Sequence, residues 1–167
     1  MRLIRTERLH IQPMSEADAE AVLDLLTDET VKRTYMLPDF GTREQAMPLF
    51  CRLCSLSLDE SRFVRGIYLD GEWIGILNDV GIEGGRIELG YALLPQYHGR
   101  GFATEALRGV INALLGAGFE EIRAGAFPDN AASIRVMEKS GMRRTGLTER
   151  VEYRGITYDC VVYSIGK

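Results

Sequence analysis

The sequence predicts an α+β fold in which a mixed, mostly antiparallel twisted sheet of about seven strands is flanked by about four helices. Three observations lead to it: strand-like segments separated by glycine-bearing turns, apolar residues at helical spacing, and one strand-helix-strand connection that indicates a parallel crossover. The 167 residues suit one domain, 1–167, which is long enough to bury roughly two-thirds of the surface of its unfolded chain.

The first third of the chain predicts an extended segment followed by two helices. Residues 3–14 are extended, and Ser15 offers an N-cap to a helix with apolar residues on one face. Thr42 and Gln45 have the spacing of a capping box for a second helix. Because proline cannot donate a helical hydrogen bond, Pro48 should kink this helix or delay its start.

The middle of the chain predicts an antiparallel meander of three strands. Asp70-Gly71 is a strong signal for a tight hairpin, and Gly84-Gly85 makes a second turn. The strands span residues 62–69, 72–82 and 86–93.

The last part of the chain predicts two helices, a strand between them and a closing hairpin. Leu107, Val110, Ile111 and Leu114 give the first helix an apolar stripe that ends at a glycine break. The other elements are expected at residues 120–127, 130–140, 143–153 and 156–165.

The loop between the third meander strand and the next helix is the most informative segment. Gly99 and Gly101 let the backbone bend without a Cβ in the way, and the first turn of the helix offers free N–H groups to an anion. This pattern predicts a pyrophosphate cradle. A dinucleotide fingerprint would need a third glycine where Thr104 stands, and the glycine-lysine step of a Walker A loop is missing from this loop.

Composition and charge argue against several classes of protein. The net charge of −4 argues against nucleic-acid binding, and no apolar run reaches the ~18 residues of a membrane span. The three cysteines do not form a disulfide framework, so we expect a cytoplasmic protein. Residues 96–144 carry a charge of +2 against −6 elsewhere, which suits a phosphorylated cofactor and a cationic acceptor. A randomly mixed surface explains such small counts equally well.

Two blocks resemble the GCN5-related N-acetyltransferase (GNAT) family. Gln96, Gly99 and Gly101 match its motif A, which holds the pyrophosphate of acetyl-CoA, and residues 130–142 resemble the motif B helix of its ribosomal-protein (Rim-type) branch. Residues 6–14 and 155–159 resemble the first strand and the last hairpin of that branch. The resemblance spans nearly the whole chain and implies the GNAT fold, with acetyl-CoA as cosubstrate.

The resemblance also implies a set of cofactor-binding residues. Leu93 and Leu94 would pair their backbone with pantetheine, the loop would hold the pyrophosphate, and Asn130 would contact the pantetheine arm. A bulge near residues 90–91 would separate this strand from the next parallel strand and open the cleft. The implied set is Leu93, Leu94, Gln96, Gly99, Arg100, Gly101, Phe102, Ala103, Thr104, Asn130 and Ser133.

Two residues are candidates for catalysis. Ser133 lies one helical turn after Asn130, where its hydroxyl would donate to the sulfur as coenzyme A leaves. Glu88 alternates with apolar residues on its strand and would be the general base, directly or through a water. Glu152 and Asp159 are alternative bases.

The predicted reaction is acetyl transfer to a primary amine by direct attack in a ternary complex. Neither histidine has a partner at ligand spacing, so no metal site is assigned, and no cysteine has an evident activating base. The acceptor is either a protein N-terminus, as the Rim-type resemblance suggests, or a small amine such as a polyamine or an aminoglycoside. A coenzyme A-binding regulatory domain without turnover is the alternative from another class. The oligomeric state is expected to be a monomer or a homodimer, with no nucleic-acid or membrane partner.

Overall fold

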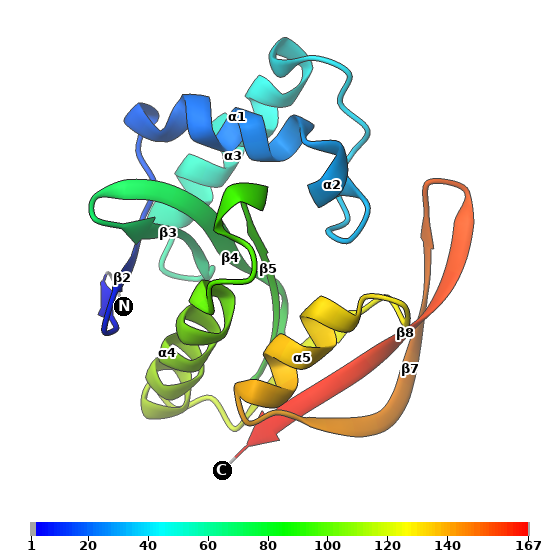
Figure 1. Ribbon diagram of the computed structural model, residues 1–167. Helices are drawn as coiled ribbons and strands as arrows, with labels where there is room; N and C mark the ends of the chain where they lie inside the picture. Colours follow the sequence, from blue (N-terminus) through cyan, green and yellow to red (C-terminus); the bar gives the residue numbers. More distant parts are fainter. Residues whose placement is uncertain (1–2, 167) are drawn as a thin grey trace.

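The computed structural model describes residues 3–166 and builds them around one eight-stranded sheet (Figure 1). The strand order is β1-β2-β3-β4-β5-β6-β8-β7, and all neighbours are antiparallel except β5 and β6. The strands are β1 (Ile4–Arg5), β2 (Leu9–Gln12), β3 (Val64–Leu69), β4 (Glu72–Glu83), β5 (Arg86–Leu93), β6 (Glu121–Ala126), β7 (Arg143–Tyr153) and β8 (Ile156–Gly166).

The helices are α1 (Ala19–Thr27), α2 (Glu29–Lys32), α3 (Arg43–Leu58), α4 (Phe102–Gly116) and α5 (Ala131–Lys139). The predicted mixed, mostly antiparallel α+β fold is confirmed. Two short elements, β1 and α2, make the difference from the expected seven strands and four helices, because segments of two and four residues leave no periodic pattern to read. No helix within residues 3–166 is long and apolar enough to cross a membrane.

The predicted hairpins follow from left-handed backbone at their turns. Both residues of Asp70-Gly71, of Gly84-Gly85 and of Arg154-Gly155 have positive φ, between 51° and 88°. A two-residue turn with positive φ at both positions matches the right-handed twist of the strands that it joins. These turns therefore set the register of β3–β4, β4–β5 and β7–β8.

The long helix α3 begins where its capping residues predict. The Thr42 hydroxyl accepts from the Gln45 N–H at 3.3 Å, and the Gln45 side chain accepts from the Thr42 N–H at 3.2 Å. Pro48 lies inside the helix, which runs from Arg43 to Leu58. The expected delay of the helix start is therefore wrong, because the capping box already holds the turn that precedes the proline.

Helices cover the sheet on both faces (Figure 1). On one face, Leu107 and Ile111 of α4 pack with Ile87 and Leu89 of β5. On the other face, α1 and α3 pack over β3 and β4 around a core that includes Trp73. The two faces of β5 therefore alternate as predicted, with Ile87, Leu89, Tyr91 and Leu93 toward α4 and Glu88, Gly90 and Ala92 away from it.

The sheet opens between its two parallel strands. β5 and β6 pair only from Arg86 with Glu121 to Leu89 with Ala124. Beyond Leu89, β5 stays with β4, whereas β6 stays with β8. The prediction of a bulge in β5 near residues 90–91 is wrong. The register shift lies in the neighbouring strand β4, between Asp79 and Gly81.

The buried carboxylate of Asp79 gives the physical reason for this bulge. It accepts from the Phe63 N–H and from Arg62 Nε, both at 2.8 Å, which ties this point of β4 to the start of β3. The adjacent residue, Val80, is left exposed and without a partner in the β5 register.

Candidate active site

The glycine loop connects β5 to α4 through a 3-10 turn at Pro95–Tyr97. Gly99 and Gly101 have φ of 72° and 82°, a region that strains any residue with a Cβ. Gly101 is the N-cap of α4, and no side chain caps the helix at this point. The first N–H groups of α4 are therefore available to an anion, as the sequence predicts.

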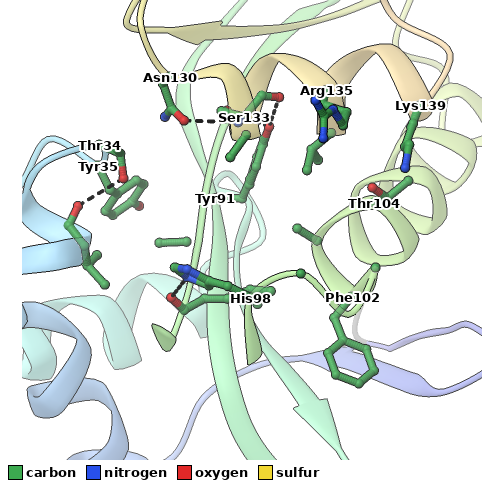
Figure 2. Close-up of a pocket in the computed structure, with 18 residues that line it drawn as sticks. Thr34, Tyr35, Tyr91, His98, Phe102, Thr104, Asn130, Ser133, Arg135 and Lys139 are labelled. Atoms are coloured by element: carbon green, nitrogen blue, oxygen red, sulfur yellow. Dashed lines mark hydrogen bonds between the residues drawn. The ribbon is translucent and has the colours of Figure 1, made fainter. Parts of the chain in front are cut away.

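A cavity of about 350 Å³ lies against this loop, between α4, α5 and the segment that follows α2 (Figure 2). It begins where β5 and β6 separate, and Tyr91, Ala92 and Leu93 of β5 contribute to its wall. The predicted cofactor-binding residues that line it are Leu93, Gly99, Gly101, Phe102, Ala103, Thr104, Asn130 and Ser133. The loop and the α5 helix, about 30 residues apart in sequence, thus face one space.

Three residues of the predicted cofactor set do not line the cavity. The Leu94 N–H donates to the Ile74 carbonyl at 2.9 Å, and the Leu94 carbonyl accepts from the Tyr97 N–H at 3.0 Å, so its backbone groups are already paired. Gln96 is exposed in the 3-10 turn. The Arg100 guanidinium lies over the Phe102 ring, 4.9 Å from its centre. The structure therefore does not support a backbone role for Leu94 toward pantetheine.

Positive side chains that sequence reasoning did not assign lie along the cavity. Arg135 and Lys139 both line it and are four residues apart on α5, so they share one face of the helix (Figure 2). Arg8 stands on the other side of the loop, where its Nε pairs with Glu105 at 2.7 Å. The i, i+4 spacing of the two α5 residues was a signal in the sequence for this basic face.

Ser133 is held by two neighbours. Its N–H donates to Asn130 Oδ1 at 3.1 Å, which makes Asn130 the N-cap of α5. Its Oγ lies 2.8 Å from the hydroxyl of Tyr91, which also donates to the Ser133 carbonyl at 3.1 Å (Figure 2). Burial raises the pKa of Tyr91 to about 12, so this phenol keeps its proton at neutral pH. The sequence pattern indicated only that Tyr91 lies on the apolar face of β5. It gave no sign of the contact between Tyr91 and Ser133.

Glu88 lies on the opposite face of β5 and does not line the cavity. It is half-buried, and burial raises the pKa of its carboxyl above the usual 4.5, with a further rise from Glu149 and an opposing effect from Arg123. Gly90, two residues along the same face, has the Tyr35 ring beside it, since a Cβ at Gly90 would lie 3.4 Å from Tyr35 Cε2. Glu88 and Ser133 thus flank the opening of the sheet from its two faces.

The two alternative bases lie in more open surroundings. Glu152 is exposed on β7. Asp159 is exposed on β8 and pairs with Arg150 at 3.3 Å. Burial makes a carboxylate hold a proton more strongly. Of these three carboxylates, Glu88 has the surroundings that suit a general base.

A hydrogen-bonded latch holds the segment after α2 against the β7–β8 hairpin. The Tyr153 hydroxyl donates to the Lys32 carbonyl at 2.8 Å and accepts from the Leu37 N–H at 3.3 Å. Lys32 is buried and pairs with Glu29 at 2.5 Å and Asp39 at 3.0 Å. Arg154 of the hairpin pairs with the same two carboxylates, at 3.2 and 3.3 Å. This latch places Val31, Thr34 and Tyr35 in the cavity wall.

Cysteine and metal chemistry are not evident in residues 3–166. Within that range no group of three or more His, Cys, Asp or Glu residues is placed to hold a metal ion. Cys160 is buried, and burial raises its pKa, while the pKa of Cys54 rises to about 11 for the same reason. Raised thiol pKa values disfavour the nucleophilic thiolate.

Residues 8–143 match the family described as the acetyltransferase (GNAT) domain, and the chain belongs to this family. It is an acetyl-CoA-dependent N-acetyltransferase. Its fold and its glycine loop are those that the sequence resemblance implies. The uncapped start of α4, the two left-handed glycines and the basic residues of α5 fit the phosphates of such a cosubstrate.

Relatives with similar sequences carry the same general name. The chain is 30% identical to the uncharacterized N-acetyltransferase YoaA of Bacillus subtilis, over 99% of this chain and 97% of YoaA. It is 28% identical to the uncharacterized N-acetyltransferase p20 of Bacillus licheniformis, over 100% of this chain and 97% of p20.

Solved structures share the fold. An acetyltransferase of the GNAT family from Bacillus anthracis has a TM-score of 0.83 at 25% identity, with 98% of each chain covered. RimL, a ribosomal L7/L12 α-N-protein acetyltransferase in complex with coenzyme A, has a TM-score of 0.86 at 18% identity, with 99% of this chain and 98% of RimL covered. The microcin C7 self-immunity acetyltransferase MccE, in complex with acetyl-CoA and AMP, has a TM-score of 0.85 at 17% identity, with 96% of this chain and 93% of MccE covered.

Proposed function

We propose that residues 1–167 form a single catalytic domain that transfers the acetyl group of acetyl-CoA to a primary amine by direct attack. The observation that carries this proposal is the opening between β5 and β6, which has Ser133 and Tyr91 on one face and the half-buried Glu88 on the other. A cosubstrate in the cavity would have a proton donor on one side and a proton acceptor on the other.

The reaction then needs two proton movements. The amine nitrogen attacks the thioester carbonyl carbon, an N–C bond forms, and the C–S bond breaks. Glu88 takes the proton that the amine loses, directly or through a water. Ser133 donates its hydroxyl proton to the departing sulfur, because a thiolate leaving group gains from a hydrogen bond that strengthens in the transition state.

Tyr91 acts as the positioning residue for Ser133. A phenol has one proton, which here can point either to the Ser133 carbonyl or to its Oγ, since both lie within 3.1 Å. When Ser133 gives up its proton, Tyr91 can turn its own hydroxyl to Oγ and stabilise the oxygen that remains, until Ser133 takes a proton from solvent and Glu88 releases its proton to solvent. Its raised pKa keeps that proton available.

We propose a protein N-terminal α-amine as the first acceptor to test. RimL, whose fold this chain shares, is described as an α-N-protein acetyltransferase. An α-amine with a pKa of about 8 is also easier to deprotonate than a lysine-like amine at about 10.4. Small amines, namely polyamines or aminoglycosides, are the second candidate, because acceptor segments vary on a fixed cofactor scaffold.

The decisive experiment measures thiol release from acetyl-CoA with a panel of amines. Purified protein is assayed against N-terminal peptides, spermidine and an aminoglycoside, with free coenzyme A quantified. We expect saturable release with at least one of them. Tight binding of acetyl-CoA without release to any amine would instead favour a regulatory coenzyme A-binding domain.

A further inference from the structure

A second cavity, of about 230 Å³, lies beside the first on the α1/α3 face of the sheet. Helices α1 and α3 contribute aliphatic side chains that include Leu49 and Leu53, and β4 contributes Trp73 and Ile76. Within residues 3–166, no charged side chain lines it. The wall is therefore apolar apart from Tyr35, Asn78 and the indole N–H of Trp73.

The two cavities are neighbours. Ile76, in the wall of the second cavity, pairs directly with Ala92, in the wall of the first, across the β4–β5 ladder. Residues opposite each other on one face have Cβ atoms only ~4.5–5.5 Å apart. Tyr35 lines both cavities, and its hydroxyl donates to Asn78 Oδ1 at their boundary. Gly90 and Glu88 follow along the same face of β5.

The second cavity opens to the surface beside the segment after α2. Met36 is 50% exposed, and Pro38 is also exposed, although both contribute to the lining. The cavity therefore has an exposed end at this segment and a buried end at Trp73 and Ile76, which are 5% and 2% exposed. The latch between this segment and the β7–β8 hairpin fixes the position of the opening.

The size and polarity of the cavity determine which chemical groups can bind in it. An apolar cavity of about 150 Å³ in another protein stays dry and binds benzene. A space of about 230 Å³ with an uncharged wall thus suits an aromatic or branched aliphatic group. A polyamine or an aminoglycoside would have to place several charged groups against this wall, which costs free energy because no charged side chain there pairs with them.

We infer that the second cavity is an acceptor subsite that binds an apolar group attached to the reacting primary amine. This inference rests on the proposed amine acetylation. The amine nitrogen lies over the face of β5 that carries Glu88 and Gly90, and the apolar group extends past Tyr35 toward Trp73. The acceptor is consequently an amine with a compact hydrophobic group, either a small molecule or the first residue of a peptide.

Trp73 supplies a direct test, because it is the single tryptophan of the chain and lies in the cavity wall. The probe is 2-phenylethylamine, with ethanolamine and spermidine as controls. We expect a saturable change in tryptophan emission with 2-phenylethylamine and none with either control. An unchanged emission at all concentrations of 2-phenylethylamine would overturn the inference.

A variant that fills the cavity gives a second readout. Leu53→Phe adds a ring to the cavity wall and should weaken 2-phenylethylamine binding at least tenfold, because the ring of the ligand loses its space. Leu58→Phe makes the same change at an exposed site on α3 and should bind like the wild type. Thermal unfolding confirms that both variants fold, and equal affinity in both would count against the inference. If Leu53→Phe does not fold, the titration of the wild-type protein with 2-phenylethylamine decides whether the cavity binds an apolar amine.

Kinetics separate this inference from the proposed function. We expect kcat/KM for 2-phenylethylamine to exceed that for ethanolamine and spermidine by at least about tenfold. A pair of peptides that differ only in a first residue of Phe or Ser distinguishes a peptide source from a small molecule. Acetylation with no preference for the apolar amines would overturn the inference about the subsite and leave the proposed acetylation standing. A Trp73 response without thiol release from any amine would support the apolar subsite and overturn the proposed reaction.

Discussion

Glu88 has to satisfy two opposing requirements. A general base works well when it is shielded enough to hold a proton, yet shielding a carboxylate destabilises the folded protein. In this structure, burial raises the pKa of Glu88, so the folded protein binds that proton more tightly than the unfolded chain does. The contribution of Glu88 to stability therefore falls as pH rises from the unfolded pKa through the raised folded value.

Replacing this carboxylate tests both requirements in one variant. Glu88→Gln should lower kcat/KM by roughly 10²-fold and remove the rise of activity with pH, because only the ionised carboxylate accepts a proton. At pH 8 its unfolding temperature should be at least that of the wild type, and the two should converge toward pH 4. If Glu88→Gln kept full activity while Glu152→Gln lost it, the base would lie in the last hairpin.

The Ser133–Tyr91 pair calls for a double-mutant cycle. Ser133→Ala should lower kcat at least tenfold with little change in acetyl-CoA affinity, because it removes the proton donor. Tyr91→Phe keeps the buried ring and removes only the hydroxyl that lies 2.8 Å from Ser133 Oγ, so its effect on kcat should be smaller. Since Tyr91 acts through Ser133, the double variant should be no slower than Ser133→Ala. Fully additive losses in kcat would contradict this role.

At the scale of elements, the start of α4 and the basic face of α5 line the same cavity, and we propose that together they bind an anion. The loop supplies backbone N–H groups and the helix dipole, while Arg135 and Lys139 supply charge from across the cavity. The geometry requires glycine at the N-cap, because Gly101 has φ of 82°. The loop therefore depends on backbone conformation more than on any one side chain.

Gly101→Glu tests the loop against its matched control, Gly101→Ala. Acetyl-CoA at ~100 times its dissociation constant should stabilise the wild type by about 2.7 kcal/mol. Gly101→Glu should lose this stabilisation, because a negative side chain at the helix start repels the phosphates. Gly101→Ala carries the same left-handed strain without the charge and should retain part of it. The measurement is the shift in unfolding temperature on adding acetyl-CoA, and equal shifts in the wild type and Gly101→Glu would rule the loop out as the cradle.

At the scale of the whole molecule, the last hairpin shapes a site to which it contributes no lining residue. Figure 1 shows the β7–β8 hairpin beside the segment that follows α2, far from it in sequence. Tyr153 and Arg154 connect the two through hydrogen bonds and ion pairs. The hairpin thereby fixes Tyr35, the residue shared by both cavities.

Removing the Tyr153 hydroxyl should loosen this segment. Tyr153→Phe leaves the Lys32 carbonyl and the Leu37 N–H without their partner, which should cost about 1–3 kcal/mol of unfolding free energy. KM for the amine should rise several-fold while acetyl-CoA affinity changes less. Tyr158→Phe removes a hydroxyl from the same hairpin and serves as the control. Chemical denaturation and steady-state kinetics measure the two effects, and an unchanged KM would mean that the latch does not shape the acceptor site.

Local rules were sufficient for most of the elements and for the backbone conformation of the glycine loop. Turn pairs such as Arg154-Gly155, the capping box at Thr42 and the glycines at 99 and 101 act within a few residues, so the sequence alone predicts them. The same applies to the alternation of β5, which places Glu88 opposite the apolar face. These features depend on backbone sterics and on a periodicity of two residues.

Only the tertiary structure decided which distant residues meet. The contact between Tyr91 and Ser133 spans 42 positions, and the Tyr153 latch spans 121 to Lys32. The bulge in β4 depends on the buried Asp79 and its partners at the start of β3, which no pattern within β5 could indicate. Sequence determines local conformation through short-range sterics, whereas the pairing of strands and the packing of helices determine the sites, because those contacts form only when the whole sheet is assembled.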